Sequence, residues 1–489
     1  MHYFEFSTKD TTLYEASSSL NSGLDEILEV RKDVSDTGVF VDASRVLIKF
    51  DLTYIQNSIA SGLIPDSGSK AAKYFLNLFD AHPTSLASSQ SLYAYPVSQS
   101  WIMGDGHSYD DPVTTEGCSW GFTDGLTDGT LWTPEISSSG GTWYQNSASG
   151  SLDFVSPFGT TAKDEVQITV AGIEYNFIAT SSVNTPTDES PIFYFATGST
   201  TAAFGSNLVT QINAADIGIT ATFSGTTALH LTASAITTAG LKDISVDTGS
   251  DGTYSDVVTL SGGDIPFEAS QSFTHKSEDV RIDVTDIVKA WNSGSISNEG
   301  FMIKRKGNVG NSDTNSDEGG SSRLGNFSFF SSDTNTKYPP TLEIVWDDSS
   351  WNIGSLTSLS STELEDSVVY MKGLRAEYKE KSKAKFRVVG RERFPSKTFS
   401  ATPAGLTVKS FPSSSFYSIL DAETNDVIVP YGTGSKLSCD STGNYFNLDL
   451  NGYQPERYYK IEYRIQSGSG TTDELDQYFD EGFTFKVSQ

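Results

Sequence analysis

The stretch SRVLIKFDL, residues 44–52, has the pattern of a β-strand from the middle of a sheet. Apolar and polar residues alternate from Val46 to Leu52, with one interruption at Leu47-Ile48. Such alternation is typical of a strand that buries one face. The stretch therefore predicts that the N-terminal part of the chain is built on a β-sheet.

Segments with similar strand patterns lie on both sides of this stretch, at residues 3–6, 11–15, 29–32, 71–80 and 91–97, and later at 300–306, 326–331 and 338–346. Residues 280–291 begin as a strand and then give an N-cap signal for a short helix at Thr285-Asp286. No tryptophan lies between Tyr144 and Val288, although large aromatics dominate core burial. The sequence thus predicts one unit split into residues 1–163 and 263–350.

Residues 164–262, between these halves, have a different pattern. Residues 166–177 predict a β-hairpin that turns at Ala171-Gly172. Residues 202–213 predict a helix, because four apolar side chains recur on one face, namely Phe204, Leu208, Val209 and Ile212. Two short strands follow at 219–223 and 229–233, so we expect a small α+β domain inserted into the first unit.

The last part of the chain, residues 351–489, again has clear strand patterns, at residues 417–421, 426–430, 445–450 and 458–463. Glycine-rich turn signals separate them. We expect a C-terminal β-sandwich of one or two subdomains. The predicted fold class is therefore mainly β: a jelly-roll sandwich interrupted by a small α+β insertion domain and followed by a C-terminal β-sandwich.

Charge and cysteine usage exclude several classes of function. The formal net charge of −29 disfavours binding to a phosphate backbone, so we expect no nucleic-acid partner. Cys118 and Cys439 lie far apart and predict free thiols in a protein folded in a reducing cytoplasm. The N-terminus has no signal-peptide pattern, and no apolar run approaches the roughly 18 residues of a membrane span, so neither feature is expected.

No pattern in the sequence predicts an enzyme. The five histidines have no metal-binding spacing, and His230 alternates with Leu229 and Leu231 as a residue on a sheet face does. There is no Gly-x-Ser-x-Gly elbow and no phosphate-binding loop. Carboxylate pairs carry little information in so acidic a chain. We expect no catalytic residue and no resident cofactor.

Two loops rich in Asp and Asn, residues 104–111 and 311–318, offer the hard oxygen ligands that Ca²⁺ prefers. Neither has the ligand order of an EF-hand, and turn residues of this kind form metal-free loops equally well. Calcium is the one cofactor for which the sequence offers ligands.

Four tryptophans in the first unit allow two interpretations: Trp101, Trp120, Trp132 and Trp143. They can form an aromatic platform for sugar rings, or they can pack in the core, as most large aromatics do. Core packing is the interpretation that the sequence favours.

A basic stretch follows: ten of the 33 basic residues lie between Met371 and Lys397. Nucleic-acid contact, a solvated strand face, and docking on an acidic surface of a neighbouring subunit are the three interpretations. The docking hypothesis rests on a strip of five residues, Lys379, Lys381, Lys383, Lys385 and Arg387.

The split first unit resembles the DNRLRE family, jelly-roll domains grouped with carbohydrate-binding modules. The resemblance covers about half of the chain, and its matching pieces are residues 44–52, the segment around Trp101, Trp120 and Trp143, residues 281–291 and residues 339–344. The inserted domain departs from that family. Residues 172–177 and 208–213 resemble small domains of phage structural proteins. Residues 416–424 and 443–446 resemble tail, neck or other virion proteins of large marine-type phages.

These resemblances imply a structural component of a bacteriophage virion, in the neck, tail or baseplate, that is made in the host cytoplasm and acts by protein–protein assembly. Its partners would be other virion proteins and copies of itself. The alternative is a glycan-binding adhesin or tail-fibre module that recognises host surface polysaccharide. A polysaccharide-cleaving enzyme is a third possibility, which fold-level likeness alone does not exclude.

Overall fold

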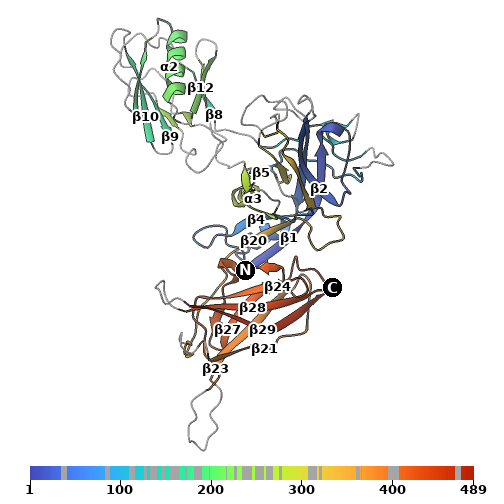
Figure 1. Cartoon of the computed structure of the whole chain (residues 1–489). Helices are drawn as coiled ribbons and strands as arrows, with labels where there is room; N and C mark the ends of the chain where they lie inside the picture. The colour runs from blue at the N-terminus through green and yellow to red at the C-terminus, as the bar shows by residue number, and fades with distance from the viewer. Residues whose placement is uncertain are drawn as a thin grey trace, which may run out of the picture.

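The structure is a computed structural model of the whole chain. It describes residues 1–34, 41–82, 89–108, 116–125, 129–132, 140–144, 149–153, 165–170, 173–180, 190–197, 199–215, 217, 219–224, 228–233, 245–247, 258–259, 268–274, 278–306, 317–318, 322–359, 364, 366–394, 407–467 and 475–489. Figure 1 shows three β-rich units along the molecule: the inserted domain at one end, the first unit in the middle and the C-terminal sandwich at the other end. The mainly β prediction is confirmed.

The first unit is jelly-roll-like and rests on a 10-stranded sheet in the order β16-β5-β18-β3-β1-β20-β4-β17, with β2 bound to β3 and β19 bound to β2. Its strands are β1 (His2–Tyr14), β2 (Ile27–Val34), β3 (Val41–Phe50), β4 (Lys73–Leu78), β5 (Gln90–Pro96), β16 (Ala269–Phe273), β17 (Val280–Asp283), β18 (Phe301–Lys304), β19 (Gly325–Phe330) and β20 (Thr341–Val345). A 3-10 turn, η1 (Glu15–Ser17), and a small hairpin of β6 (Phe122–Asp124) and β7 (Thr130–Leu131) lie beside it.

The sheet curls until its two end strands meet. β1 makes this possible, because its first half pairs with β20 and its second half pairs with β3, with a register shift between Ser7 and Lys9. At the ends of the sheet, the Gln271 side chain of β16 donates to the Asp279 carbonyl (3.0 Å) and accepts from the Arg281 amide of β17 (2.7 Å). The Gln271 side chain therefore links the two end strands where backbone hydrogen bonds link the other neighbouring strands of the sheet.

Two corners at which a strand leads into a helix share one hydrogen-bonding arrangement. β3 leads into α1 (Thr53–Ala60), and β17 leads into α3 (Thr285–Asn292). In the first, Asp51 accepts hydrogen bonds from the Thr53 amide (2.9 Å) and hydroxyl (2.6 Å). In the second, Asp283 accepts the same pair from Thr285. The predicted strand and helix in residues 280–291 are confirmed, but the N-cap residue is Val284, which has no side-chain cap, and the carboxylate that accepts the Thr285 amide is Asp283, one residue before it.

The inserted domain has two sheets, in the orders β11-β10-β9-β14-β15 and β12-β13-β8, around the helix α2 (Thr201–Ala215). Its strands are β8 (Ser149–Asp153), β9 (Glu165–Val170), β10 (Ile173–Thr180), β11 (Ile192–Ala196), β12 (Ile219–Ser224), β13 (Ala228–Ala233), β14 (Ser245–Asp247) and β15 (Val258–Thr259). Phe204, Leu208 and Ile212 of α2 are fully buried, as their spacing predicts. β8 pairs with β13, so this domain begins before the predicted boundary at residue 164.

The C-terminal unit is a sandwich of two sheets, β21-β23-β27-β26 and β22-β29-β28-β24-β25. Its elements are β21 (Ser367–Lys372), β22 (Glu377–Lys379), β23 (Lys383–Glu392), β24 (Ser415–Asp421), β25 (Val427–Val429), η2 (Thr433–Ser435), β26 (Ser438–Asp440), β27 (Gly443–Asp449), β28 (Tyr458–Ser467) and β29 (Leu475–Ser488). One continuous core joins both sheets, so the described part of this unit is a single domain. Cys118 and Cys439 are free and buried.

Candidate functional site

The four tryptophans that the sequence analysis singled out lie in one cluster. They pack against Leu47 of β3 and Met302 of β18. Trp101, Trp120 and Trp132 expose only 4%, 5% and 3% of their surface, and Trp143 is half-buried. The structure brings the four residues together, but three of the rings have no face open to a sugar. Core packing, the interpretation that the sequence favours, describes the positions of Trp101, Trp120 and Trp132.

Beneath these rings lies a buried charge cluster that sequence reasoning missed. The Arg45 guanidinium is fully buried and binds both carboxylate oxygens of Glu318, at 3.1 and 2.7 Å. It also donates to the Gly140 carbonyl at 2.6 Å. Its carbon lies 4.7 Å from the centre of the Trp120 ring and 5.2 Å from that of Trp143. The guanidinium of Arg45 thus makes hydrogen bonds in its plane, and tryptophan rings cover its faces. Guanidinium groups favour this environment.

Lys304 completes the cluster. Its ammonium lies 3.2 Å from Glu318 and 4.8 Å from the centre of the Trp143 ring. Burial lowers the pKa of Lys304 to about 8, against the attraction of Glu318. One carboxylate therefore serves two cations inside the protein, and the cluster ties residues 45, 140, 304 and 318 together. We interpret it as a structural element, since none of its charges reaches solvent.

The two predicted calcium loops are described in part. Residues 311–316 and 109–111 lie outside the described residues. Glu318, from the second loop, is the carboxylate bound by Arg45 and Lys304 and is therefore occupied. In the first loop Asp105 is exposed, and His107 lies 3.6 Å from Asp25. Among the described residues, no group of three acidic, histidine or cysteine side chains is placed to hold a metal ion.

The predicted basic strip lies on the C-terminal sandwich, and its three strand residues pair within the same sheet. Arg387 holds Asp440 with both terminal nitrogens (2.8 and 2.7 Å), and Lys385 lies 3.5 Å from the same carboxylate. The hydrogen bond from Arg387 holds the pKa of Asp440 well below its usual range. Lys383 lies 3.6 Å from Asp449.

The other two members of the strip lie outside this sheet, since β22 belongs to the second sheet of the sandwich and a turn links it to β23. Lys379 in β22 and Lys381 in the following turn are both exposed, and Lys381 has a positive φ of 56°. Part of the strip is therefore neutralised inside the chain. Whether it docks on a neighbouring subunit stays a prediction.

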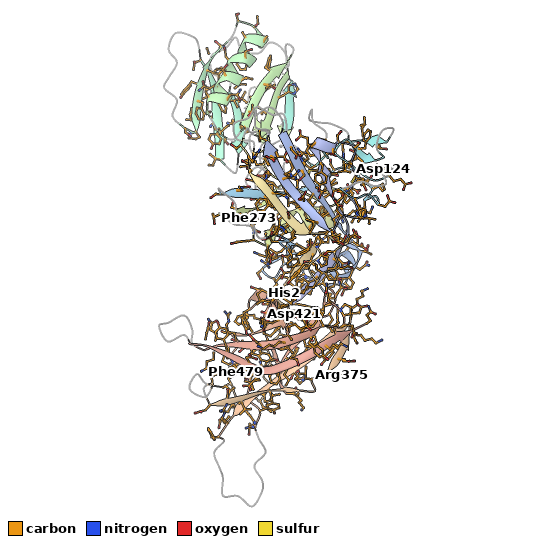
Figure 2. The ribbon with its side chains drawn as sticks, turned by 45° about the vertical axis from the view of Figure 1, so that its right-hand side comes forward. His2, Asp124, Phe273, Arg375, Asp421 and Phe479 are labelled. Carbon is orange, nitrogen blue, oxygen red and sulfur yellow. The ribbon has the colours of Figure 1, made fainter. Side chains whose placement is uncertain are left out.

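The first unit and the sandwich meet in a firm joint. Phe4 of β1 is 7% exposed and belongs to the hydrophobic core of the sandwich, where its ring packs edge-on to Tyr453. The Asn451 side chain donates to the Phe4 carbonyl at 2.6 Å. Lys337 of the first unit binds Asp421 (3.2 Å) and Asp426 (2.6 Å) of the sandwich. Figure 2 shows His2 and Asp421 at this junction.

A groove of about 680 Å³ opens beside the joint, between β17 and β20 on one side and β25 on the other. We call it the waist groove. Its walls are largely aromatic and half-buried: Phe6, Phe79, Phe330 and Tyr338. Phe330 and Tyr338 stack with ring centres 5.7 Å apart, and Val427 of β25 is 56% exposed at the rim.

Acidic side chains also line the waist groove. Asp279 accepts the Asp80 amide at 2.8 Å. Partial burial raises the pKa of Asp279 against that hydrogen bond, and the carboxylates of Asp80 and Asp426 add to the rise. Two further acids already have cations, since Glu343 binds Arg281 (3.0 Å) and Asp426 binds Lys337. Aromatic rings beside the Asp279 carboxylate form an environment for a cationic group on an apolar body.

Sequence reasoning missed the waist groove, because its lining residues run from Phe4 to Gly452 and no local pattern connects them. Among the described residues, no helix is long and apolar enough to cross a membrane. Comparisons of the chain with protein-family models, with curated proteins and with solved structures found no match.

Proposed function

We propose that the protein is a non-catalytic structural component of a bacteriophage particle, in its neck, tail or baseplate, and that it acts by protein–protein assembly. The resemblances of its three parts point to a particle, and the geometry fits a building block. The role of each unit is to present a surface at a fixed place.

The observation that carries the proposal is the joint between the first unit and the sandwich. Phe4 belongs to the core of the other unit, and Lys337 bridges to two of its carboxylates. Separate domains in a chain usually move relative to each other unless their interface is large and apolar. Phe4 in the core of the sandwich and the ion pairs of Lys337 resist such movement, which suits an assembly subunit that sets the spacing of its neighbours.

The charged groups of the first unit support the same reading. The buried ion pairs join Glu318 to Arg45 and Lys304, and tryptophan rings cover them. In some proteins a buried polar or charged group fixes one arrangement of the chain, and we infer that role for this cluster. A single fixed arrangement suits a subunit that must present the same faces in every copy.

Quantitative mass spectrometry of purified particles tests this proposal by counting the chain against the major capsid protein. A copy number near a multiple of three or six supports a neck, tail or baseplate component, because particle parts follow closed rotational symmetry. Absence of the chain from purified particles overturns the proposal.

One observation favours glycan binding as a second candidate. On the outer face of the sandwich, Tyr478 is 62% exposed and packs edge-on to Tyr431, with ring centres 5.8 Å apart. Arg464 lies 5.3 Å from the centre of the Tyr431 ring and 4.7 Å from that of Phe416. Exposed aromatics beside an arginine stack well on sugar rings. Binding of host envelope polysaccharide that is lost on Tyr478→Ala, with the fold intact, is the result this candidate requires.

A further inference from the structure

The C-terminal end of β23 carries arginines, whereas the waist groove carries acidic side chains. Phe394 lies two residues after the end of this strand and is 76% exposed, the highest value among the large hydrophobic residues that the structure describes. Arg391 and Arg393 flank it on the strand side. We call Arg391–Phe394 the tip. It combines an apolar anchor with two arginines, and its one acid, Glu392, is paired with Lys409. The waist groove combines aromatic rings with four acids, two of which are paired with Arg281 and Lys337.

The tip of a given copy lies far from its own waist groove. β23 begins at Lys383, which lies beside Asp449 and 5.6 Å from the centre of the Tyr54 ring of the first unit, close to the joint. From there the strand runs away from the joint for the rest of its length (Figure 1). At about 3.3 Å per residue, its far end is roughly 30 Å from its start. The groove of the same copy is therefore out of reach.

We propose that the waist groove is the docking site for a second copy of this chain, which inserts its tip between Val427 and the packed rings of Phe79 and Tyr338, so that Arg393 faces Asp279. This inference rests on the proposed assembly function and names the partner and the surface. Charge and apolar character match on both sides, and exposed Phe and Arg side chains are typical anchors of protein interfaces.

The contact joins different surfaces on the two copies, so it is heterologous. Heterologous contacts form closed rings when the rotation between copies closes and open filaments when it does not. The firm joint fixes the angle between the tip and the groove within each copy, and therefore fixes the rotation from one copy to the next. Ring-forming parts of a particle need this property.

Sedimentation of the full-length chain over a range of concentrations is the first test. The wild type should associate as concentration rises, and Phe394→Ala should weaken association by roughly tenfold or more, as for an interface anchor. Tyr478→Ala is the matched control, because it removes an aromatic side chain that is 62% exposed on another face, and it should leave association unchanged. Tryptophan fluorescence shows that each variant keeps its fold.

A charge swap tests the orientation. Arg393→Glu and Asp279→Arg should each weaken association, and the chain with both changes should recover it, since each copy then offers a reversed tip to a reversed groove. A monomeric wild type, or loss of association in the double variant greater than in either single variant, overturns the proposal.

Cross-linking separates this inference from the proposed function. Arg391→Cys chains, which keep the Phe394 anchor, mixed with Val427→Cys chains should form a disulfide dimer in preference to either chain alone; Cys118 and Cys439 are buried and do not compete. If particles contain the chain but no mixed dimer forms, this docking mode is wrong while the assembly role stands. If mixed dimers form and particles lack the chain, the docking mode stands without the virion role.

Discussion

At the scale of single residues, Arg45 is the side chain on which the first unit most depends. It has no exposed surface, binds Glu318 with two hydrogen bonds and lies between two tryptophan rings. Its replacement leaves Glu318 with only Lys304, inside the protein. Sequence reasoning placed residue 45 in a strand but had no reason to pair it with a residue 273 positions away.

We expect Arg45→Ala to lower the free energy of unfolding of the first unit by about 3–5 kcal/mol, the usual cost of breaking a buried ion pair. Arg45→Lys should also destabilise, because a lysine cannot bind both carboxylate oxygens or cover both rings. Urea unfolding followed by tryptophan fluorescence reports mainly on this unit, since six of the seven tryptophans lie in it and only Trp351 lies beside the sandwich. Equal stability of Arg45→Ala and the wild type contradicts the structural role of the cluster.

Asp10 should make stability depend on pH. Burial raises the pKa of Asp10 to about 6, against hydrogen bonds from Ser332 and Ser7. The folded state therefore keeps a proton that the unfolded state loses at its normal pKa near 4. Stability from this group is full below about pH 4 and is lost as pH rises through about 6, by up to about 3 kcal/mol.

Asp10→Asn should flatten that slope and stabilise the protein at pH 7. Urea unfolding of both proteins between pH 4 and pH 7 measures the difference. Asp105→Asn changes an exposed carboxylate and serves as the control. A wild-type slope that persists in Asp10→Asn assigns the pH dependence to other groups.

At the scale of elements, the sequence predicted what local periodicity determines. The α2 face, the β9–β10 hairpin and the strand-to-helix corner at residues 280–291 match their patterns. β8 was missed, since Ser149–Asp153 has no alternation and becomes a strand only by pairing with β13. β1 was predicted as two segments, because the polar residues 7–10 interrupt the pattern, and pairing with β20 and β3 makes it one strand.

The two matching corners give a prediction at this scale. Asp51→Ala and Asp283→Ala should each cost about 1 kcal/mol, because each change removes the carboxylate that binds the amide and hydroxyl of the first helical threonine. Asp286→Ala is a matched control, since Asp286 is exposed in the first turn of α3 and accepts no capping hydrogen bond among those that the structure describes. It should cost less than Asp283→Ala in urea unfolding. Equal losses would assign the effect to the helix dipole instead of the cap.

At the scale of the whole molecule, the joint and the waist groove were beyond prediction. Periodicity identifies a buried face but does not say which unit covers it, and Phe4 packs into a sandwich that begins more than 350 residues later. The basic stretch was visible in the sequence, yet its pairing with Asp440 and Asp449 required the register of β23 against β27. Surfaces between units follow from packing and not from local pattern.

Phe4→Ala should loosen the joint. The change removes a ring from the core of the sandwich, and Phe-to-Ala substitutions in cores cost about 3–5 kcal/mol. We expect faster proteolysis between residues 347 and 359 and a larger radius of gyration in X-ray scattering. Phe4→Leu keeps most of the apolar volume, so its proteolysis rate and radius of gyration should lie between those of the wild type and Phe4→Ala. Unchanged scattering and proteolysis in Phe4→Ala contradict a joint held by this residue.

The central claim is that this chain is a building block whose surfaces bind copies of itself in a particle. Electron cryomicroscopy of purified particles tests it most directly. The account predicts density for a ring of copies in the neck, tail or baseplate, with the Arg391–Phe394 tip of each copy in the waist groove of the next. Particles in which every such density is accounted for by other proteins, with this chain absent, contradict it.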